Sequence, residues 1–239
     1  MSISLSIVIP LFNEEHSLTK VIEDHVRVLS DLENGPSNWE IICLDDASTD
    51  RTWEQLQQCV ARYPQMRLLR HKHNCGITLS FIRLFQEAKG DYIYLTAGDG
   101  QWPAENLKRL FDKLKESQVD LVIGVREERD KVYNWWRKCL SYGFNFIAEY
   151  LLGIQTKDAN GIKLGKKEIF NFPLRSKSFF SEIERIHLAH KNGYKITYTS
   201  VLFLPRSAGK EHGAKFKNVL ATFVDLVRFL FTHTSPRAR

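Results

Sequence analysis

Apolar residues form five short runs in the first half of the chain, and polar or turn-forming residues bound each run. The runs cover residues 5–10, 40–44, 67–70, 92–96 and 120–124. Runs of this length, rich in β-branched and aromatic side chains, predict buried β-strands.

Between these runs the apolar residues recur every three to four positions, which predicts helices with one face against a core. The clearest stripe is made of Leu18, Val21, Ile22, His25, Val26 and Leu29. Three further helices are expected: one that ends near residue 63, one over residues 78–88 and one over residues 103–117. Ser48 or Thr49 can cap the first of these helices. Strands separated by such helices predict an α/β fold with a mostly parallel sheet.

The regular alternation ends after Arg126. A helical, aromatic-rich segment is expected over residues 132–152, short strands near 162–164 and 195–204, and a helix near 179–191. A last helix, near 214–231, has an apolar stripe of Phe216, Val219, Leu220, Phe223, Val227 and Leu230. Charges interrupt it too often for a bilayer span, which needs ~20 mostly apolar residues. It can pack on the domain, the commoner outcome, or lie in a membrane interface.

Charge is distributed unevenly along the 239 residues. Residues 1–158 hold 19 basic and 23 acidic residues, whereas residues 159–239 hold 15 and 5, a net charge of +10. The second part is therefore expected to face an anionic partner, either a phosphorylated ligand, a membrane surface or nucleic acid, although no nucleic-acid-binding motif is present. Four scattered cysteines and the absence of a signal-peptide pattern favour a reducing cytosol.

Polar clusters follow three of the expected strands directly. They are Asn13 with Glu14, Asp45 with Asp46, and Asp99 with Gln101. In a parallel sheet the carboxyl ends of the strands share one edge, where ligands bind. The glycine-rich motifs of dinucleotide-binding folds and P-loop proteins are absent, so a bound diphosphate would need a divalent cation with oxygen ligands. Basic side chains, such as Arg126, Arg206 and Lys210, could add to the binding of the diphosphate.

Four motifs in order resemble the family 2 glycosyltransferases of the GT-A fold. They are Ile-Val-Ile-Pro-Leu-Phe-Asn-Glu-Glu (7–15), Leu-Asp-Asp-Ala-Ser-Thr-Asp (44–50), Gly-Asp through Asp-Gly-Gln-Trp-Pro (90–103) and Asp-Leu-Val-Ile-Gly-Val-Arg (120–126). Within this family the chain is most similar to the polyprenyl-phosphate glycosyltransferases of the dolichyl-phosphate mannose synthase type, over residues 4–212.

The resemblance implies a Rossmann-like, mostly parallel central sheet flanked by helices, with C-terminal helices on the acceptor side. A GT-A domain would cover residues 1–212, divided into a nucleotide-sugar-binding part (1–126) and an acceptor part (127–212). Residues 213–239 would form an amphipathic helix and tail.

The resemblance also implies roles for single residues. Nucleotide binding falls to Pro10, Phe12, Glu14, Leu44, Asp46 and Asp99. Asp99 and Gln101 would hold Mg²⁺ or Mn²⁺, and Arg126, Arg206 and Lys210 would bind phosphate. Asp99, Asp158 and Arg126 would be the catalytic residues. Ala97 departs from the family pattern, because it replaces the first carboxylate of the usual Asp-x-Asp, and Phe12 replaces a tyrosine.

The implied reaction is an inverting transfer of a sugar from a UDP- or GDP-linked donor to a polyprenyl phosphate, at the cytoplasmic membrane face. A phosphate monoester is largely a dianion near pH 7 and needs no general base. A hydroxyl acceptor would need one, and Asp158 is the candidate, unless it only bonds a loop amide. Ala97 leaves a third reading, a non-catalytic nucleotide-sugar-binding protein.

Partners follow from the same resemblance. Lys131 to Tyr150 form an aromatic, basic segment that fits a membrane interface through which a lipid phosphate enters, or a helix packed in the core. The attachment would be peripheral, and a role in the cell envelope is expected. The donor's base and sugar, the acceptor and the oligomeric state, including a homo-oligomer, stay open.

Overall fold

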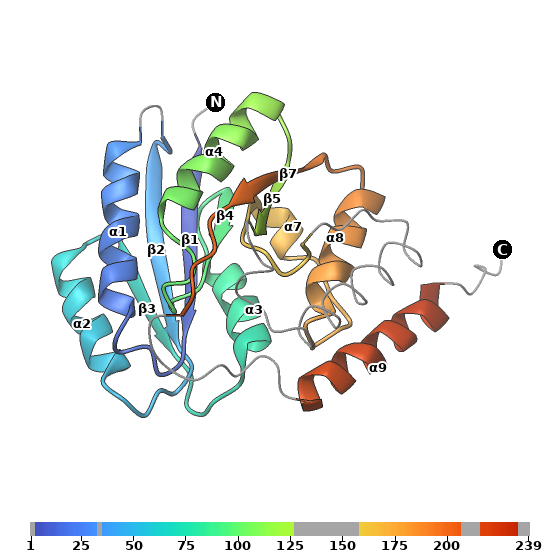
Figure 1. The fold of residues 1–239 in the computed structure, drawn as a ribbon, viewed down its shortest axis with the longest axis horizontal. Helices are drawn as coiled ribbons and strands as arrows, with labels where there is room; N and C mark the ends of the chain where they lie inside the picture. Colours follow the sequence, from blue (N-terminus) through green and yellow to red (C-terminus); the bar gives the residue numbers. More distant parts are fainter. Residues whose placement is uncertain (1–2, 33–34, 127–157, 207–215, 234–239) are drawn as a thin grey trace.

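The computed structural model describes residues 3–32, 35–126, 158–206 and 216–233 (Figure 1). Its strands are β1 Ser4–Leu11, β2 Asn38–Asp45, β3 Met66–Arg70, β4 Tyr92–Leu95, β5 Leu121–Arg126, β6 Lys163–Lys166 and β7 Ile196–Val201. Its helices are α1 Leu18–Asp31, α2 Thr52–Arg62, α3 Ile77–Glu87, α4 Glu105–Ser117, α7 Lys167–Phe170, α8 Ser181–Lys191 and α9 Phe216–His233. The seven expected strands and the α/β class are confirmed.

The strands form one sheet in the order β3-β2-β1-β4-β6-β5-β7. All neighbouring pairs are parallel except those of β6, which runs antiparallel to both β4 and β5. Strands β1, β2 and β4 are adjacent and parallel, so their carboxyl ends lie at one edge of the sheet. This topology brings the three polar clusters of the sequence to that edge.

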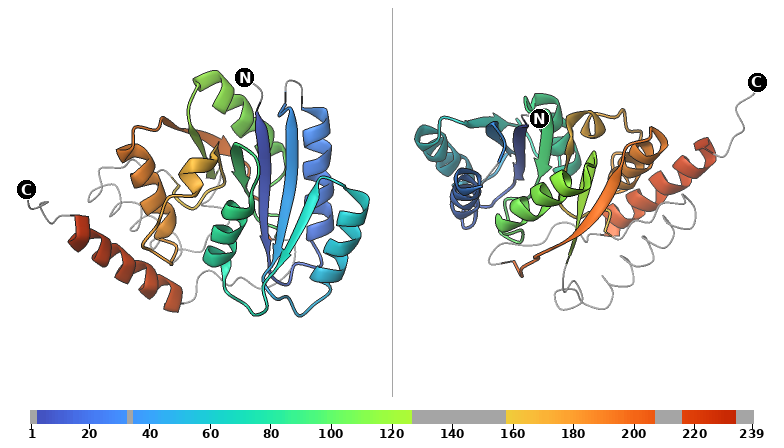
Figure 2. Two further views of the ribbon diagram at one scale, coloured as in Figure 1. Left: turned by 180° about the vertical axis from the view of Figure 1, so that it is seen from behind. Right: turned by 90° about the horizontal axis from the view of Figure 1, so that it is seen from above.

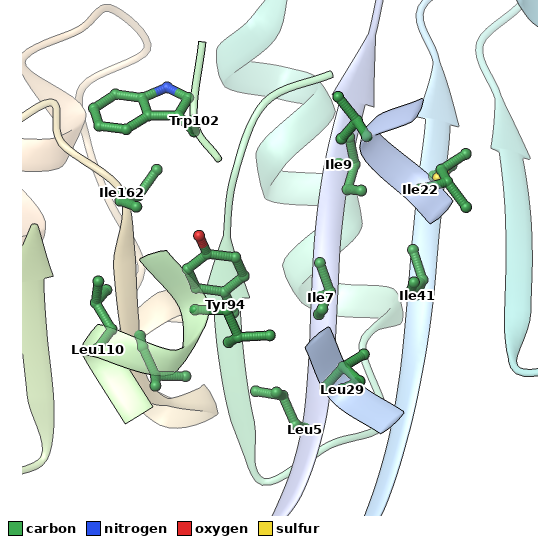
Figure 3. Close-up of a cluster of buried hydrophobic side chains, with 14 of the residues drawn as sticks. Leu5, Ile7, Ile9, Ile22, Leu29, Ile41, Tyr94, Trp102, Leu110 and Ile162 are labelled. Carbon is green, nitrogen blue, oxygen red and sulfur yellow. The ribbon is translucent and has the colours of Figure 1, made fainter. Parts of the chain in front are cut away.

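Helices cover both faces of the sheet (Figure 2). Alternate residues of β1 point to opposite faces, so Ile7 and Ile9 belong to one buried cluster and Val8 to another. The first cluster includes side chains of α1, α2 and α4 and is shown in Figure 3. The second includes side chains of α3, α7, α8 and α9. Burial on both faces explains why the parallel strands read as continuous apolar runs.

The expected cap of α2 is wrong. Neither Ser48 nor Thr49 caps this helix, which begins at Thr52. The Asp50 carboxylate accepts a hydrogen bond from the Thr52 amide at 3.0 Å, while the Ser48 hydroxyl accepts one from the Asn13 amide at 2.9 Å. Ser48 therefore joins two loops instead of starting a helix.

The packed face of α9 also differs from the expected stripe. Thr222, Leu226 and Phe229 are buried, whereas Leu220 and Phe223 of the stripe are 52% and 57% exposed. The Phe229 ring packs edge-on against Phe180. Asp225 accepts hydrogen bonds from the amides of residues 177 and 178 at 3.2 and 3.1 Å. These contacts fix which side of α9 meets the domain, and the helix periodicity alone did not reveal it.

Candidate functional site

The loops after β1 and β2 are hydrogen-bonded to each other at the carboxyl edge of the sheet. The Thr49 amide donates to the Asn13 side-chain oxygen at 2.8 Å, in addition to the bond from the Asn13 amide to Ser48. Asn13 and Ala47 have φ angles of 56° and 59°, in the left-handed region that residues other than glycine seldom occupy. The two loops thus form one rigid wall, held by paired polar contacts.

The loop after β4 is joined to the same wall through Ser17. Its hydroxyl donates to the Gly98 carbonyl at 2.7 Å, and Ser17 also contacts the Glu14 carboxylate at 3.3 Å. Asp99 follows Gly98 and lies close enough to Glu14 to interact electrostatically with it. The structure therefore brings together the carboxylates of two loops that are far apart in the sequence.

Glu14 is the most perturbed carboxylate of this edge. Burial is the main cause, and the nearby Asp99 and Asp50 add to it; together they raise the pKa of Glu14 to about 7, although Arg206 acts in the opposite direction. Arg206 forms an ion pair with Glu14, and both side chains are mostly buried. A carboxyl group with a strongly raised pKa beside a second carboxylate and an arginine makes this edge a candidate functional site.

The segment that carries Arg206 crosses the loop after β4. The Leu204 amide donates to the Gln101 carbonyl at 2.9 Å, and the Gln101 side-chain nitrogen donates to the Leu204 carbonyl at 3.2 Å. This pairing orients the side-chain amide of Gln101, so any contact of that side chain with a cation must come from its oxygen atom. Lys210, the other basic residue expected here, lies outside the described residues.

Asp46 is fully engaged with the loop after β3. Its carboxylate accepts hydrogen bonds from the His71 ring and from the amides of Cys75 and Gly76, each at 2.8 Å. The ligand atoms of Asp46, His71 and Cys75 lie within 4.8 Å of one another, a spacing that could hold a metal ion. Because the carboxylate already has three donors, we interpret the group as a clamp that shapes the loop beside the expected nucleoside position.

Arg126 and Asp158 form a buried pair. The guanidinium donates to the two carboxylate oxygens at 2.7 and 2.6 Å, and the side chains are only 8% and 3% exposed. The guanidinium also lies over the rings of Trp102 and Phe203, at 5.8 and 5.3 Å from their centroids. This bidentate geometry makes Asp158 the residue that positions Arg126.

The oxygen donors present fit a hard divalent cation. Asp99 supplies a carboxylate, whose Oδ1 accepts a hydrogen bond from the backbone amide of Gln101 at 3.0 Å, and the Glu14 carboxyl group lies nearby. Mg²⁺ and Mn²⁺ take oxygen ligands, and Mg²⁺ commonly needs only one or two carboxylates when phosphates and waters complete its shell. Ala97 offers no side-chain ligand atom and packs partly against the core.

Of the residues expected from the sequence, the structure gathers Glu14, Asp99, Gln101 and Arg206 directly. Pro10 and Leu44 are paired neighbours on β1 and β2, and Leu44 is fully buried in the core. Phe12 is half-buried. The sequence analysis missed Ser17 and His71. His71 could have been noticed, because it follows β3 at the same edge, whereas no pattern in the sequence distinguishes Ser17.

Comparisons with known proteins identify the family and the fold of the chain. A family model described as Glycosyl transferase family 2 matches residues 6–178. The chain is 34% identical over 151 residues to a dolichol-phosphate mannosyltransferase of Pyrococcus furiosus, covering 62% of this chain and 41% of that protein. It is 30% identical over 158 residues to a dodecaprenyl-phosphate galacturonate synthase of Rhizobium johnstonii, covering 66% and 46%. The chain thus spans less than half the length of these two relatives.

A solved structure with the same fold is glucosyl-3-phosphoglycerate synthase of Mycobacterium tuberculosis, in complex with Mn²⁺, uridine diphosphate and phosphoglyceric acid. The TM-score is 0.68 at 17% identity, and the match covers 95% of this chain and 78% of that one. At this level of identity the likeness concerns the fold.

Proposed function

The chain belongs to glycosyl transferase family 2, and from this premise we propose that it transfers a sugar from a nucleotide-diphosphate sugar to a polyprenyl phosphate, with inversion at the anomeric carbon. The observation that carries the proposal is the meeting of Glu14, Asp99, Gln101 and Arg206 at one edge of the sheet. The two relatives described above, whose names include a dolichol phosphate and a dodecaprenyl phosphate, support the acceptor class.

Asp99 and Gln101 are proposed to hold Mg²⁺ or Mn²⁺, which would offset the charge that develops on the departing diphosphate. The paired loops after β1 and β2 bind the nucleoside, with Leu44 and Phe12 beneath it. Arg206 exchanges its contact with Glu14 for the donor phosphates, and Lys210 joins it.

Arg126 is proposed to bind phosphate, since Asp158 and two aromatic rings hold its guanidinium in place. The geometry of Asp158 favours a phosphate acceptor over a hydroxyl acceptor. Both of its oxygens are bound to Arg126, so a proton would have to be taken at the cost of a buried ion pair. A phosphate monoester attacks without a general base, because it is already ionised near pH 7.

Peripheral binding to the cytoplasmic membrane face is proposed for access to the lipid. Among the described residues, no helix combines the length and apolar character that crossing a bilayer demands. Helix α9 exposes an apolar surface of Leu220, Phe223, Val224 and Phe231 on the strongly basic second part of the chain. Apolar side chains combined with basic charge suit an anionic lipid surface.

The test measures sugar transfer from UDP- and GDP-linked donors with Mg²⁺ or Mn²⁺, with and without undecaprenyl or dolichyl phosphate. We expect lipid-dependent turnover that Asp99→Ala abolishes while the far-ultraviolet circular dichroism spectrum stays unchanged. Asp112→Ala is the matched control, because Asp112 lies on α4 and pairs with the surface residue Lys108. Near-parental activity of Asp99→Ala would show that the site is misassigned.

The same assay separates the other readings. Transfer to a sugar or other hydroxyl instead of the lipid would favour the second acceptor class. We retain this class as an alternative because the solved structure described above is a complex with phosphoglyceric acid. Donor binding without turnover for every acceptor would favour a non-catalytic protein.

A further inference from the structure

Residues 158–161 form a turn that leads towards β6 and carries Asp158. The Gly161 amide donates a hydrogen bond to the Asp158 carbonyl at 3.1 Å, which closes the turn. The Asp158 carboxylate holds the Arg126 guanidinium through two hydrogen bonds. A bidentate contact orients a guanidinium only if the carboxylate is itself fixed, so the orientation of Arg126 depends on what holds this turn.

The backbone of the turn packs closely against β5. The Gly124 amide donates to the Ile162 carbonyl at 2.8 Å, and a Cβ at residue 161 would lie 2.0 Å from the Gly124 carbonyl oxygen. These contacts set the distance between the turn and β5. The Gly161 carbonyl accepts a hydrogen bond from a side chain, the Lys163 ammonium, at 3.0 Å. The turn is thus tied to whatever holds this ammonium in place.

Glu182 holds the Lys163 ammonium. Lys163 is 1% exposed, and its Nζ lies 3.0 Å from a carboxylate oxygen of Glu182 at the start of α8. A buried ammonium needs a partner of opposite charge, because leaving water disfavours the charged form. Burial alone would raise the pKa of Glu182, but Lys163 and Arg185 outweigh it and lower the pKa to about 2. The carboxylate is therefore charged at physiological pH.

Arg185 anchors Glu182 to the core. Its Nε donates to the Glu182 carboxylate at 3.3 Å, and its Nη1 donates to the carbonyls of Ile169 and Phe170. The Arg185 guanidinium also lies 4.9 Å from the centroid of the Phe85 ring. A continuous series of polar contacts therefore runs from the core, through α8, to the turn that carries Asp158.

The Lys163–Glu182 pair faces the protein interior. Both side chains line a cavity of about 110 Å³, whose other lining residues include the apolar Ile77, Phe81 and Leu95. Yet Lys163 is almost fully buried, and Oε2 of Glu182, the oxygen nearest to the ammonium, is buried as well. The contacts of the pair thus go to the turn and to α8, and the pair is closed to a ligand.

We propose that Lys163 and Glu182 are positioning residues for Arg126: they fix the turn at 158–161, and the turn holds Asp158 where it orients the guanidinium. The proposal rests on the proposed function in one respect, the binding of phosphate by Arg126. A misplacement of about 1 Å can reduce turnover by ~100-fold, so a residue that touches no substrate can still control the rate.

The first experiment follows Arg126 itself and requires no activity. Nuclear magnetic resonance of protein labelled with ¹⁵N-arginine gives the hydrogen-exchange rate of the Arg126 Nε–H, and Arg126→Lys assigns the signal. Exchange should be slow in the parent, because this N–H donates to Asp158 at 2.7 Å in a side chain that is 8% exposed.

The test variant combines Lys163→Met with Glu182→Gln. It removes both charges of the pair, and the glutamine oxygen can still accept from Arg185. We expect exchange at the Arg126 Nε–H to become at least about tenfold faster, while the backbone amides of β1 keep their rates to within about twofold. A general loss of stability would accelerate both, so this comparison separates positioning from a merely structural role.

Three single substitutions complete the series. Lys163→Arg keeps a cation beside Glu182, with room in the adjoining cavity, and should retain slow exchange. Lys166→Met is the matched control, because Lys166 is on the same strand, 40% exposed and paired with Asp120. Glu182→Gln alone should accelerate exchange in the same direction, and it decides the case if the double variant does not fold.

The second experiment measures transfer to undecaprenyl phosphate. The double variant should lower kcat/KM for this acceptor at least about tenfold, while the dissociation constants of UDP and GDP with Mn²⁺ stay within about twofold. In an Arg126→Ala background the same double variant should cause no further loss beyond about twofold, because its effect acts through Arg126.

The outcomes separate the two proposals. Unchanged exchange at the Arg126 Nε–H in the folded variants refutes the positioning role, and so does an equal loss of kcat/KM with and without Arg126. If the parent transfers sugar to no phosphate acceptor, the proposed function fails, and the exchange rates alone decide whether the pair positions Arg126.

Discussion

Replacing Glu14 by glutamine should change how the stability of the protein depends on pH. Glu14 is largely buried beside Asp99, and its pKa in the folded protein is raised from 4.5 to about 7. In the unfolded chain the same carboxyl returns to its ordinary value. Between these two pH values the folded state therefore keeps a proton that the unfolded state has released.

The sign and size of the effect follow from this difference. The free energy of unfolding falls as the pH rises from about 4.5 to about 7, and the contribution is constant outside that window. A shift of this size corresponds to about 3 kcal/mol, because each unit of pKa is worth ~1.4 kcal/mol. Since 12% of the side chain remains exposed, the realised change will be smaller. A change of ~3 kcal/mol would move the melting temperature by about 10 °C at most.

The assay is thermal or denaturant unfolding at pH 4 to 8 with EDTA, for the parent and for Glu14→Gln. The variant cannot ionise at this position, so its stability relative to the parent should increase between pH 5 and pH 8. Glu105→Gln serves as the control, because Glu105 is 55% exposed, and its curve should run parallel to the parent's. A difference between Glu14→Gln and the parent that is equal at pH 5 and pH 8 would refute the reasoning.

Three other substitutions test the proposed metal site and the residues that support it. Ala97→Asp adds an oxygen ligand and should lower the Mn²⁺ concentration for half-maximal activity; an unchanged metal titration would put residue 97 outside the coordination sphere. Asp158→Asn removes one partner of a buried ion pair, so it should lower the free energy of unfolding by about 3 kcal/mol in denaturant unfolding and strongly reduce turnover. A decrease in the free energy of unfolding below ~1 kcal/mol would indicate that contacts other than Asp158 hold Arg126 in place. Gly161→Ala would place a Cβ 2.0 Å from the Gly124 carbonyl oxygen and should cost at least about 2 kcal/mol. A melting temperature equal to the parent's would contradict the close packing of residue 161 against β5.

Much of the functional edge was predictable because parallel strands share a direction. Once the apolar runs are recognised as strands separated by helices, residues that directly follow them must meet at one edge, and Glu14 and Asp99 do so. The division of the domain into donor and acceptor parts stays a prediction. The aromatic segment at 131–150 lies outside the described residues, so its proposed role in lipid entry also remains a prediction.

The side-chain partners of several residues could not be predicted from the sequence. Ser48 has the properties of a helix cap, yet its hydroxyl bonds the Asn13 amide, because the positive φ of Asn13 and Ala47 brings two distant loops together. Asp158 resembled a general base, yet the fold places it against Arg126 with both oxygens engaged. Side-chain partners of this kind depend on contacts between residues more than 30 positions apart.

The amino-acid sequence by itself determined the α/β class, the positions of the strands and the edge at which the polar residues gather. These properties depend on local periodicity and on strand direction, which neighbouring residues specify. Only the tertiary structure decided which side of α9 is buried, which carboxylate has the raised pKa, and that Lys163 and Glu182 share a cavity wall. Burial and charge pairing are set by side chains that the fold brings together from distant parts of the chain, and no local pattern encodes those distances.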